Sequence, residues 1–92
     1  MTFEVFGIVQ GVFFRKYTKE MADSLKLHGF VENTNRKTVV GEAQGPLQDI
    51  HQFKEFLKSK GSPQSKIDKL ESQITPITEY TFPFFSIKRR AK

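Results

Sequence analysis

Apolar residues near the N-terminus occupy both faces of a short extended segment. Over residues 3–9, Phe3, Val5, Gly7 and Val9 alternate with Glu4, Phe6 and Ile8. This alternation predicts a strand, and apolar groups on both faces indicate a central one. From Phe14 onward the apolar positions change to helical spacing, in a stripe formed by Phe14, Tyr17, Met21, Ala22 and Leu25. We therefore expect an amphipathic helix that ends before His28.

The middle of the chain predicts a hairpin and a second helix. Two strands are expected over 29–33 and 38–44, joined by a polar turn at 34–37. Gly45 and Pro46 close the hairpin, with Pro46 at the first helical position of the helix that follows. The apolar stripe of that helix is Leu47, Ile50, Phe53 and Leu57, and its end is marked by Lys58, Lys60 and Gly61.

The C-terminal part predicts two more strands, over 70–75 and 82–87. Pro76 and Pro83 interrupt this region, and proline is confined to edge strands or strand ends, so both strands are expected at the edges of the sheet. The aromatic run over 82–85 is expected to complete the core.

The order strand, helix, strand, strand, helix, strand is typical of the split βαβ arrangement. We expect an α+β, ferredoxin-like fold, with an antiparallel sheet and both helices on one face. If the strand over 38–44 lies between the other two, strands 3–9 and 29–33 run parallel and end at one edge of the sheet. That edge would hold the 10–14 turn, the start of the first helix and Asn33. With 92 residues, we expect one domain over 1–92.

Composition narrows the chemistry. The absence of cysteine excludes disulfides, thiol catalysis and thiolate metal sites, and a reducing cytosol is the simplest location. No stretch approaches the roughly 20 apolar residues of a membrane span. A net charge of +5 favours anionic ligands, whether phosphate, nucleic acid or a membrane surface. The basic runs at 36–37 and 88–90 are more typical of solvated turns and chain ends than of binding sites.

The segment between the first strand and the first helix has the features of an anion site. Gly11 can adopt conformations closed to other residues, and the amides at a helix N-terminus favour negative charge. Arg15 follows at once, and a guanidinium binds two phosphate oxygens at any relevant pH. One glycine and one arginine are by themselves weak support for a phosphate site over a surface arginine in a tight turn.

Two longer motifs carry a specific resemblance. Residues 7–15 read Gly7-Ile8-Val9-Gln10-Gly11-Val12-Phe13-Phe14-Arg15 and resemble the G-x-V-Q-G-V-x-F-R signature of acylphosphatases. Residues 29–34 read Gly29-Phe30-Val31-Glu32-Asn33-Thr34 and are similar to the G-W-V-x-N-T segment of that family. The likeness continues through 38–46 and 85–87, so it spans nearly the whole chain.

The resemblance implies an acylphosphatase, an enzyme that hydrolyses the carboxyl-phosphate anhydride. In the family, Arg15 and the loop amides would hold the phosphate, and Asn33 would position the attacking water. The loop amides are those of Gln10, Gly11, Val12, Phe13, Phe14 and Arg15. The leaving carboxylate has a conjugate acid with a pKa of about 4, so no general acid is needed to protonate it. The resemblance also implies a reaction without a metal, a cofactor or a covalent intermediate. His28 and His51 are expected to be structural or solvent-facing.

The same resemblance implies a cytoplasmic monomer that acts on a small acyl phosphate, is inhibited competitively by phosphate, and binds no nucleic acid or membrane. The natural substrate, a metabolite or an aspartyl phosphate on a protein, stays open. A compact site built around a phosphoryl group can be indifferent to the acyl part.

Three departures from the family pattern and two rival functions accompany this prediction. Family members usually have tryptophan where this chain has Phe30, and glycine where it has Lys37. They often have an aromatic residue near the end, where this chain has Arg89 to Lys92. Lys37 would be strained if the turn needs a positive φ, and a packing contact near the site would be lost at the tail. The rivals are a catalytically idle relative and an RNA-binding module. The second lacks its stacking platform, because the strand over 38–44 contains no aromatic residue.

Overall fold

The computed structural model describes residues 1–88. In chain order the elements are β1 (Thr2–Ile8), α1 (Phe14–Ser24), β2 (His28–Asn33), β3 (Val39–Gln44), α2 (Leu47–Ser59), β4 (Lys66–Gln73) and β5 (Phe85–Lys88). Every predicted helix and strand is present. The expected loss of a tail contact, and Arg89 itself, lie outside the described residues.

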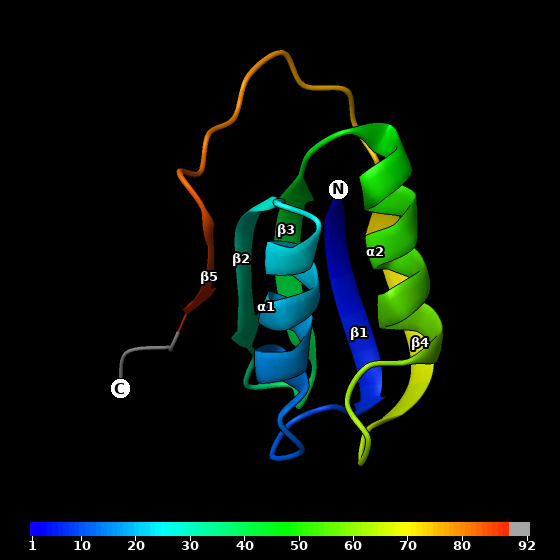
Figure 1. The fold of residues 1–92 in the computed structure, drawn as a ribbon. Coiled ribbons are helices and arrows are strands. Elements are labelled where there is room, and N and C mark those ends of the chain that lie inside the picture. Colours follow the sequence, from blue (N-terminus) through cyan, green and yellow to red (C-terminus); the bar gives the residue numbers. More distant parts are fainter. Residues whose placement is uncertain (89–92) are drawn as a thin grey trace.

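One sheet contains all of these strands, in the order β4-β1-β3-β2-β5. β1 and β2 each pair antiparallel with β3 and therefore run parallel to each other, as predicted. β4 and β5 are the edge strands, also as predicted. Both helices cover the same face of the sheet (Figure 1). The expected α+β, ferredoxin-like arrangement is confirmed.

The sheet departs from the expected antiparallel pairing at β5. This strand pairs parallel to β2, with Phe85 opposite Gly29. The connection from β4 arches over one end of the sheet and enters the far edge from that same end (Figure 1). β5 must therefore run opposite to β4 and parallel to β2, which makes the sheet mixed.

The core lies between the sheet and the two helices. Phe53 of α2 is at its centre, with edge-to-face ring contacts to Phe3 and Phe85 at centroid distances of 5.8 Å each. Burial of each such side chain contributes about 1.5–3 kcal/mol to folding. The other buried apolar residues of the helices and central strands are Val5, Phe14, Ala22, Val31, Val39, Ala43, Ile50 and Leu57.

The buried faces of both helices differ slightly from their predicted apolar stripes. In α1 the buried positions are Phe14, Thr18 and Ala22, whereas Tyr17 is 37% exposed. In α2, Leu47 is 58% exposed although it was expected in the stripe. A residue in the first turn of a helix lies at the end of the packed interface, so apolar spacing alone does not bury it.

Three boundaries also differ from the predictions. Pro46 is the N-cap residue, with extended backbone, and α2 begins one residue later. β4 begins at Lys66 rather than at 70, because this edge strand is largely exposed and lacks a clear apolar alternation. β5 begins at Phe85 rather than at 82, and of the aromatic run at 82–85, Phe85 is buried but Phe84 is 63% exposed. Among residues 1–88, no helix is long and apolar enough to cross a membrane.

Candidate active site

A cavity of about 490 Å³ opens at the edge of the sheet where β1 and β2 end. It is lined by Val9, Gly11, Phe13, Phe14, Arg15, Lys16, Asn33 and Ile87. The parallel course of β1 and β2 therefore brings the loop after β1, the start of α1 and Asn33 together, as the topology predicted. Val9, Lys16 and Ile87 were not among the predicted site residues, and the predicted Gln10 and Val12 are not among the lining residues.

The loop of residues 10–13 (the 10–13 loop) turns the chain from β1 into α1 with an unusual backbone. Gly11 has a φ of 74° and Phe13, the N-cap residue of α1, has a φ of 60°. A left-handed residue followed by right-handed helix turns successive amides toward one concave side, which suits an anion. The space beside Gly11 is open, since a Cβ there would meet no atom within 4 Å. Glycine is needed here for its backbone conformation rather than for its size.

The first turn of α1 adds further donors. Its first backbone hydrogen bond runs from the Tyr17 N–H to the Phe13 carbonyl, at 3.1 Å. The amides of Phe14, Arg15 and Lys16 precede that bond and have no acceptor within the helix. Together with the helix dipole they favour negative charge at this point. Among the cavity-lining residues of the described chain, two are cationic and none is a carboxylate.

The side chain of Gln10 ties the 10–13 loop to the connection between β2 and β3. Its Nε2 donates to the carbonyls of Thr34 and Thr38, at 2.8 Å each. These carbonyls belong to the turn that connects β2 to β3. The sequence motif predicted a role only for the backbone amide of Gln10, not for this side-chain bridge. No side-chain pattern could have revealed it, because both acceptors are backbone atoms.

The turn of residues 34–37 (the 34–37 turn) is fixed by a dense set of polar contacts. The hydroxyls of Thr34 and Thr38 lie 2.6 Å apart, and the Thr38 hydroxyl donates to Glu4 Oε2 at 2.6 Å. Arg36 Nη2 donates to the same oxygen at 2.9 Å. The Thr38 hydroxyl, followed by Arg36, holds the pKa of the Glu4 carboxyl below its ordinary value of 4.5. Asn33 comes directly before this turn, so the network holds the end of β2 in place.

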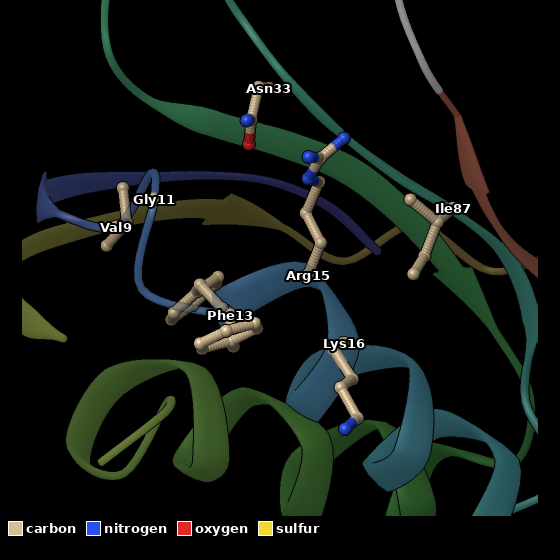
Figure 2. Close-up of a pocket in the computed structure, with 8 residues that line it drawn as sticks. Val9, Gly11, Phe13, Arg15, Lys16, Asn33 and Ile87 are labelled. Carbon is tan, nitrogen blue, oxygen red and sulfur yellow. The ribbon is translucent and has the colours of Figure 1, made fainter. Parts of the chain in front are cut away.

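Arg15 and Asn33 approach the same space from different elements. Figure 2 shows the Arg15 guanidinium extending from the first turn of α1 toward the strand that carries Asn33. The amide of Asn33 points down into the region between that strand and the 10–13 loop (Figure 2). The arrangement can hold an anion against Arg15 and the loop, with one neutral amide beside it.

The two histidines lie away from this cavity. His28 Nδ1 is 2.7 Å from the Phe82 carbonyl, and its ring stacks on Tyr80 at 3.8 Å. His51 is exposed on α2. His28 is therefore structural and His51 faces solvent. Residues 1–88 contain no group of three or more His, Cys, Asp or Glu side chains placed to hold a metal ion.

Comparison with known proteins gives a consistent result. A family model described as Acylphosphatase matches residues 1–87. Acylphosphatase-1 of Homo sapiens is 51% identical over 67 residues, which cover 73% of this chain and 68% of that protein. Acylphosphatase-2 of Rattus norvegicus is 42% identical over 87 residues, which cover 94% of this chain and 90% of that protein. The crystal structure of acylphosphatase from Bacillus subtilis matches with a TM-score of 0.88 and 36% identity, covering 95% of this chain and 94% of that one.

Proposed function

Because this chain belongs to the acylphosphatase family, we propose that Arg15 and the 10–13 loop hold the phosphoryl group of its substrate and that Asn33 holds the attacking water. The enzyme hydrolyses small acyl phosphates to a carboxylate and inorganic phosphate. The observation that carries the proposal is the single cavity that unites Gly11, Arg15 and Asn33.

The phosphoryl group needs fixed positive charge and hydrogen-bond donors. Its non-bridging oxygens would accept hydrogen bonds from the amides of residues 10–15 and from the Arg15 guanidinium. A planar guanidinium binds two such oxygens at once, and preorganised donors stabilise the charge of the transferring group without reorganisation. The leaving carboxylate departs unprotonated, because its conjugate acid has a pKa of about 4. No general acid is needed at this side of the reaction.

The attacking water needs a direction rather than a strong base. The side chain of Asn33 offers a carbonyl oxygen that accepts a hydrogen bond from water and an NH₂ group that donates one. Held between this amide and the phosphoryl group, a water molecule would lie opposite the leaving oxygen. Such positioning replaces a bimolecular encounter with an oriented one.

Several further properties follow from this mechanism and from the family. We propose that hydrolysis requires no metal, that the protein acts as a single domain over 1–92, and that it works as a cytoplasmic monomer. We also propose that it has no nucleic-acid or membrane partner. Free phosphate would compete with substrate, because the loop and Arg15 contact the part of the substrate that phosphate shares.

The experiment that tests this proposal measures acetyl phosphate hydrolysis after dialysis against a chelator, with and without added phosphate. The expected result is full activity in chelator and purely competitive inhibition by phosphate. Activity that disappears in chelator and returns with a divalent ion would contradict the metal-free mechanism. Inhibition by phosphate that substrate cannot overcome would place the phosphate site elsewhere.

A further inference from the structure

The cavity is much larger than the group that the proposed mechanism places in it. Its volume is about 490 Å³, whereas one water molecule accounts for about 30 Å³ of liquid. A phosphoryl group, made of one phosphorus and three oxygens, therefore fills a small part of the space. The remainder must be solvent or the acyl part of the substrate, and four of the lining side chains are apolar: Val9, Phe13, Phe14 and Ile87.

Phe13 is the exceptional member of this apolar set. Its side chain is 68% exposed, whereas that of the next residue, Phe14, is 1% exposed and belongs to the core. Its backbone is left-handed, with a φ of 60°, which is unfavourable for a residue with a Cβ. Phe13 takes part in none of the aromatic pairs formed among residues 1–88. The fold therefore places a largely exposed aromatic ring at the cavity, on a residue whose backbone conformation is unfavourable.

Strain and exposure together at a binding cavity are grounds for a functional role. On the basis of the proposed function, we infer that the Phe13 ring is the contact surface for the acyl group and makes the enzyme select apolar, above all aromatic, acyl phosphates. With the phosphoryl group at Arg15, the acyl group would extend from the 10–13 loop over Phe13. The ring would then be covered by substrate instead of water.

The alternative is that Lys16 binds the acyl group and makes the enzyme prefer anionic acyl phosphates. This residue also lines the cavity. In Figure 2, however, its side chain extends in the direction opposite to that of Arg15, away from Asn33. Phe13 lies in the loop itself, next to the residues that would hold the phosphoryl group (Figure 2). The geometry thus favours an apolar contact over an ionic one.

The test compares kcat/KM for benzoyl phosphate with kcat/KM for acetyl phosphate in Phe13→Asn and Phe13→Leu. Asparagine tolerates the left-handed backbone but removes the ring, and leucine keeps an apolar side chain. We expect the benzoyl-to-acetyl ratio to fall about 10-fold in Phe13→Asn, at the lower end of what an apolar contact discriminates. Phe13→Leu should give an intermediate ratio. The matched control is Phe84→Ala, which removes another exposed phenylalanine, at 63% exposure, and should leave the ratio and the activity unchanged.

A second measurement avoids turnover altogether. We expect benzylphosphonate and methylphosphonate to compete for the same site, and their C–P bonds are not hydrolysed. Phe13→Asn should weaken inhibition by the benzyl compound about 10-fold more than inhibition by the methyl compound. An unchanged benzoyl-to-acetyl ratio, or equal losses for both phosphonates, would overturn the inference, because Phe13 would then act only on the loop. Failure of the proposed function would give a different result. In that case Arg15→Gln would leave phosphate inhibition unaffected, whatever the benzoyl-to-acetyl ratios in the Phe13 variants.

Discussion

The 10–13 loop and the 34–37 turn lie side by side and share a backbone feature, yet they are stabilised in opposite ways. Each contains a left-handed residue other than glycine, Phe13 in the loop and Lys37 in the turn, with φ values of 60° and 66°. The turn is held by hydrogen bonds between Thr34 and Thr38, which flank it, and from Thr38 to Glu4. The loop is tied to the turn by the side chain of Gln10.

This difference separates a scaffold from a binding element. Backbone donors that already have partners inside the protein cannot bind a ligand without losing them. The turn uses its polar groups for its own structure, and it fixes the end of β2 and the anchor points of Gln10. The amides at the start of α1 precede the first hydrogen bond of the helix and remain available for an anion. Substitutions in the loop should therefore change activity first, and substitutions in the turn should change stability first.

The largest effect is expected at Arg15. Arg15→Gln should lower kcat/KM by about 10³-fold, the upper end for one preorganised donor, and should weaken phosphate inhibition as well. Arg15→Lys should be nearly as damaging, because an ammonium cannot make the two-pronged contact. The matched control is Lys19→Gln, which removes a cation of α1 that pairs with Asp23 at 2.6 Å. Near-normal activity in Arg15→Lys would remove Arg15 from the phosphate site.

Gln10 is the direct link between the two regions. Gln10→Ala removes the Gln10 donor from the carbonyls of Thr34 and Thr38 and frees the loop, so we expect a stability loss of about 1–2 kcal/mol together with a clear fall in kcat/KM. Gln44→Ala is the control, because the Gln44 amide makes a similar pair of contacts with Thr81, one of them 2.8 Å from Nε2 to the hydroxyl, at the other end of the sheet. It should lower the melting temperature with normal activity. Equal activity losses in both variants would show that stability alone is being measured.

Lys37 tests the turn without touching the loop. The positive φ that the sequence analysis foresaw as a source of strain is present. Lys37→Gly should therefore stabilise the protein by about 1 kcal/mol, which is the lower end of the cost of a left-handed residue with a Cβ. Chemical denaturation measures the change, and kcat should stay within error of the wild-type value. A lower stability would mean that the Lys37 side chain makes a contribution larger than the strain.

Glu4 gives the turn a dependence on pH. Its pKa is lowered in the folded state by the Thr38 hydroxyl and by Arg36, so its contribution to stability is complete above the ordinary value of 4.5 and disappears as the pH falls through the lowered pKa. Glu4→Gln should destabilise the protein at pH 7 by less than about 1 kcal/mol, since Arg36 is solvent-exposed. The difference between wild type and variant should vanish in acid. A difference that is constant between pH 7 and acid would show that the ionised carboxylate is not involved.

Much of this fold could be predicted because its signals are local. The apolar spacing of α1 and α2, the polar turn at 34–37 and the prolines near the edge strands each act within a few residues. The parallel pairing of β5 could not be predicted in this way, since it depends on the path that residues 74–84 take across the end of the sheet. Leu47 and Tyr17 were assigned to buried stripes because spacing identifies a helix face but not where the packed interface ends.

The candidate site likewise has features that the sequence predicted and features that it did not. Gly11, Arg15 and Asn33 were found through two sequence motifs, and the parallel arrangement of β1 and β2 explains why they share a cavity. The contacts of Gln10 and the exposure of Phe13 depend on backbone positions that only the folded chain defines. The rival prediction of an RNA-binding module is set aside by the family match over residues 1–87.

The central claim, that Arg15 holds the phosphoryl group while Asn33 holds only the water, is tested most directly by measuring kcat and the inhibition constant for phosphate in Asn33→Ala. The water matters once in-line attack begins, so kcat should fall by about 10²- to 10³-fold while phosphate inhibition changes little. The melting temperature must be measured alongside, because a purely structural Asn33 at the start of the turn would lower stability and leave turnover near normal. A variant that folds normally and keeps most of its kcat would contradict the account.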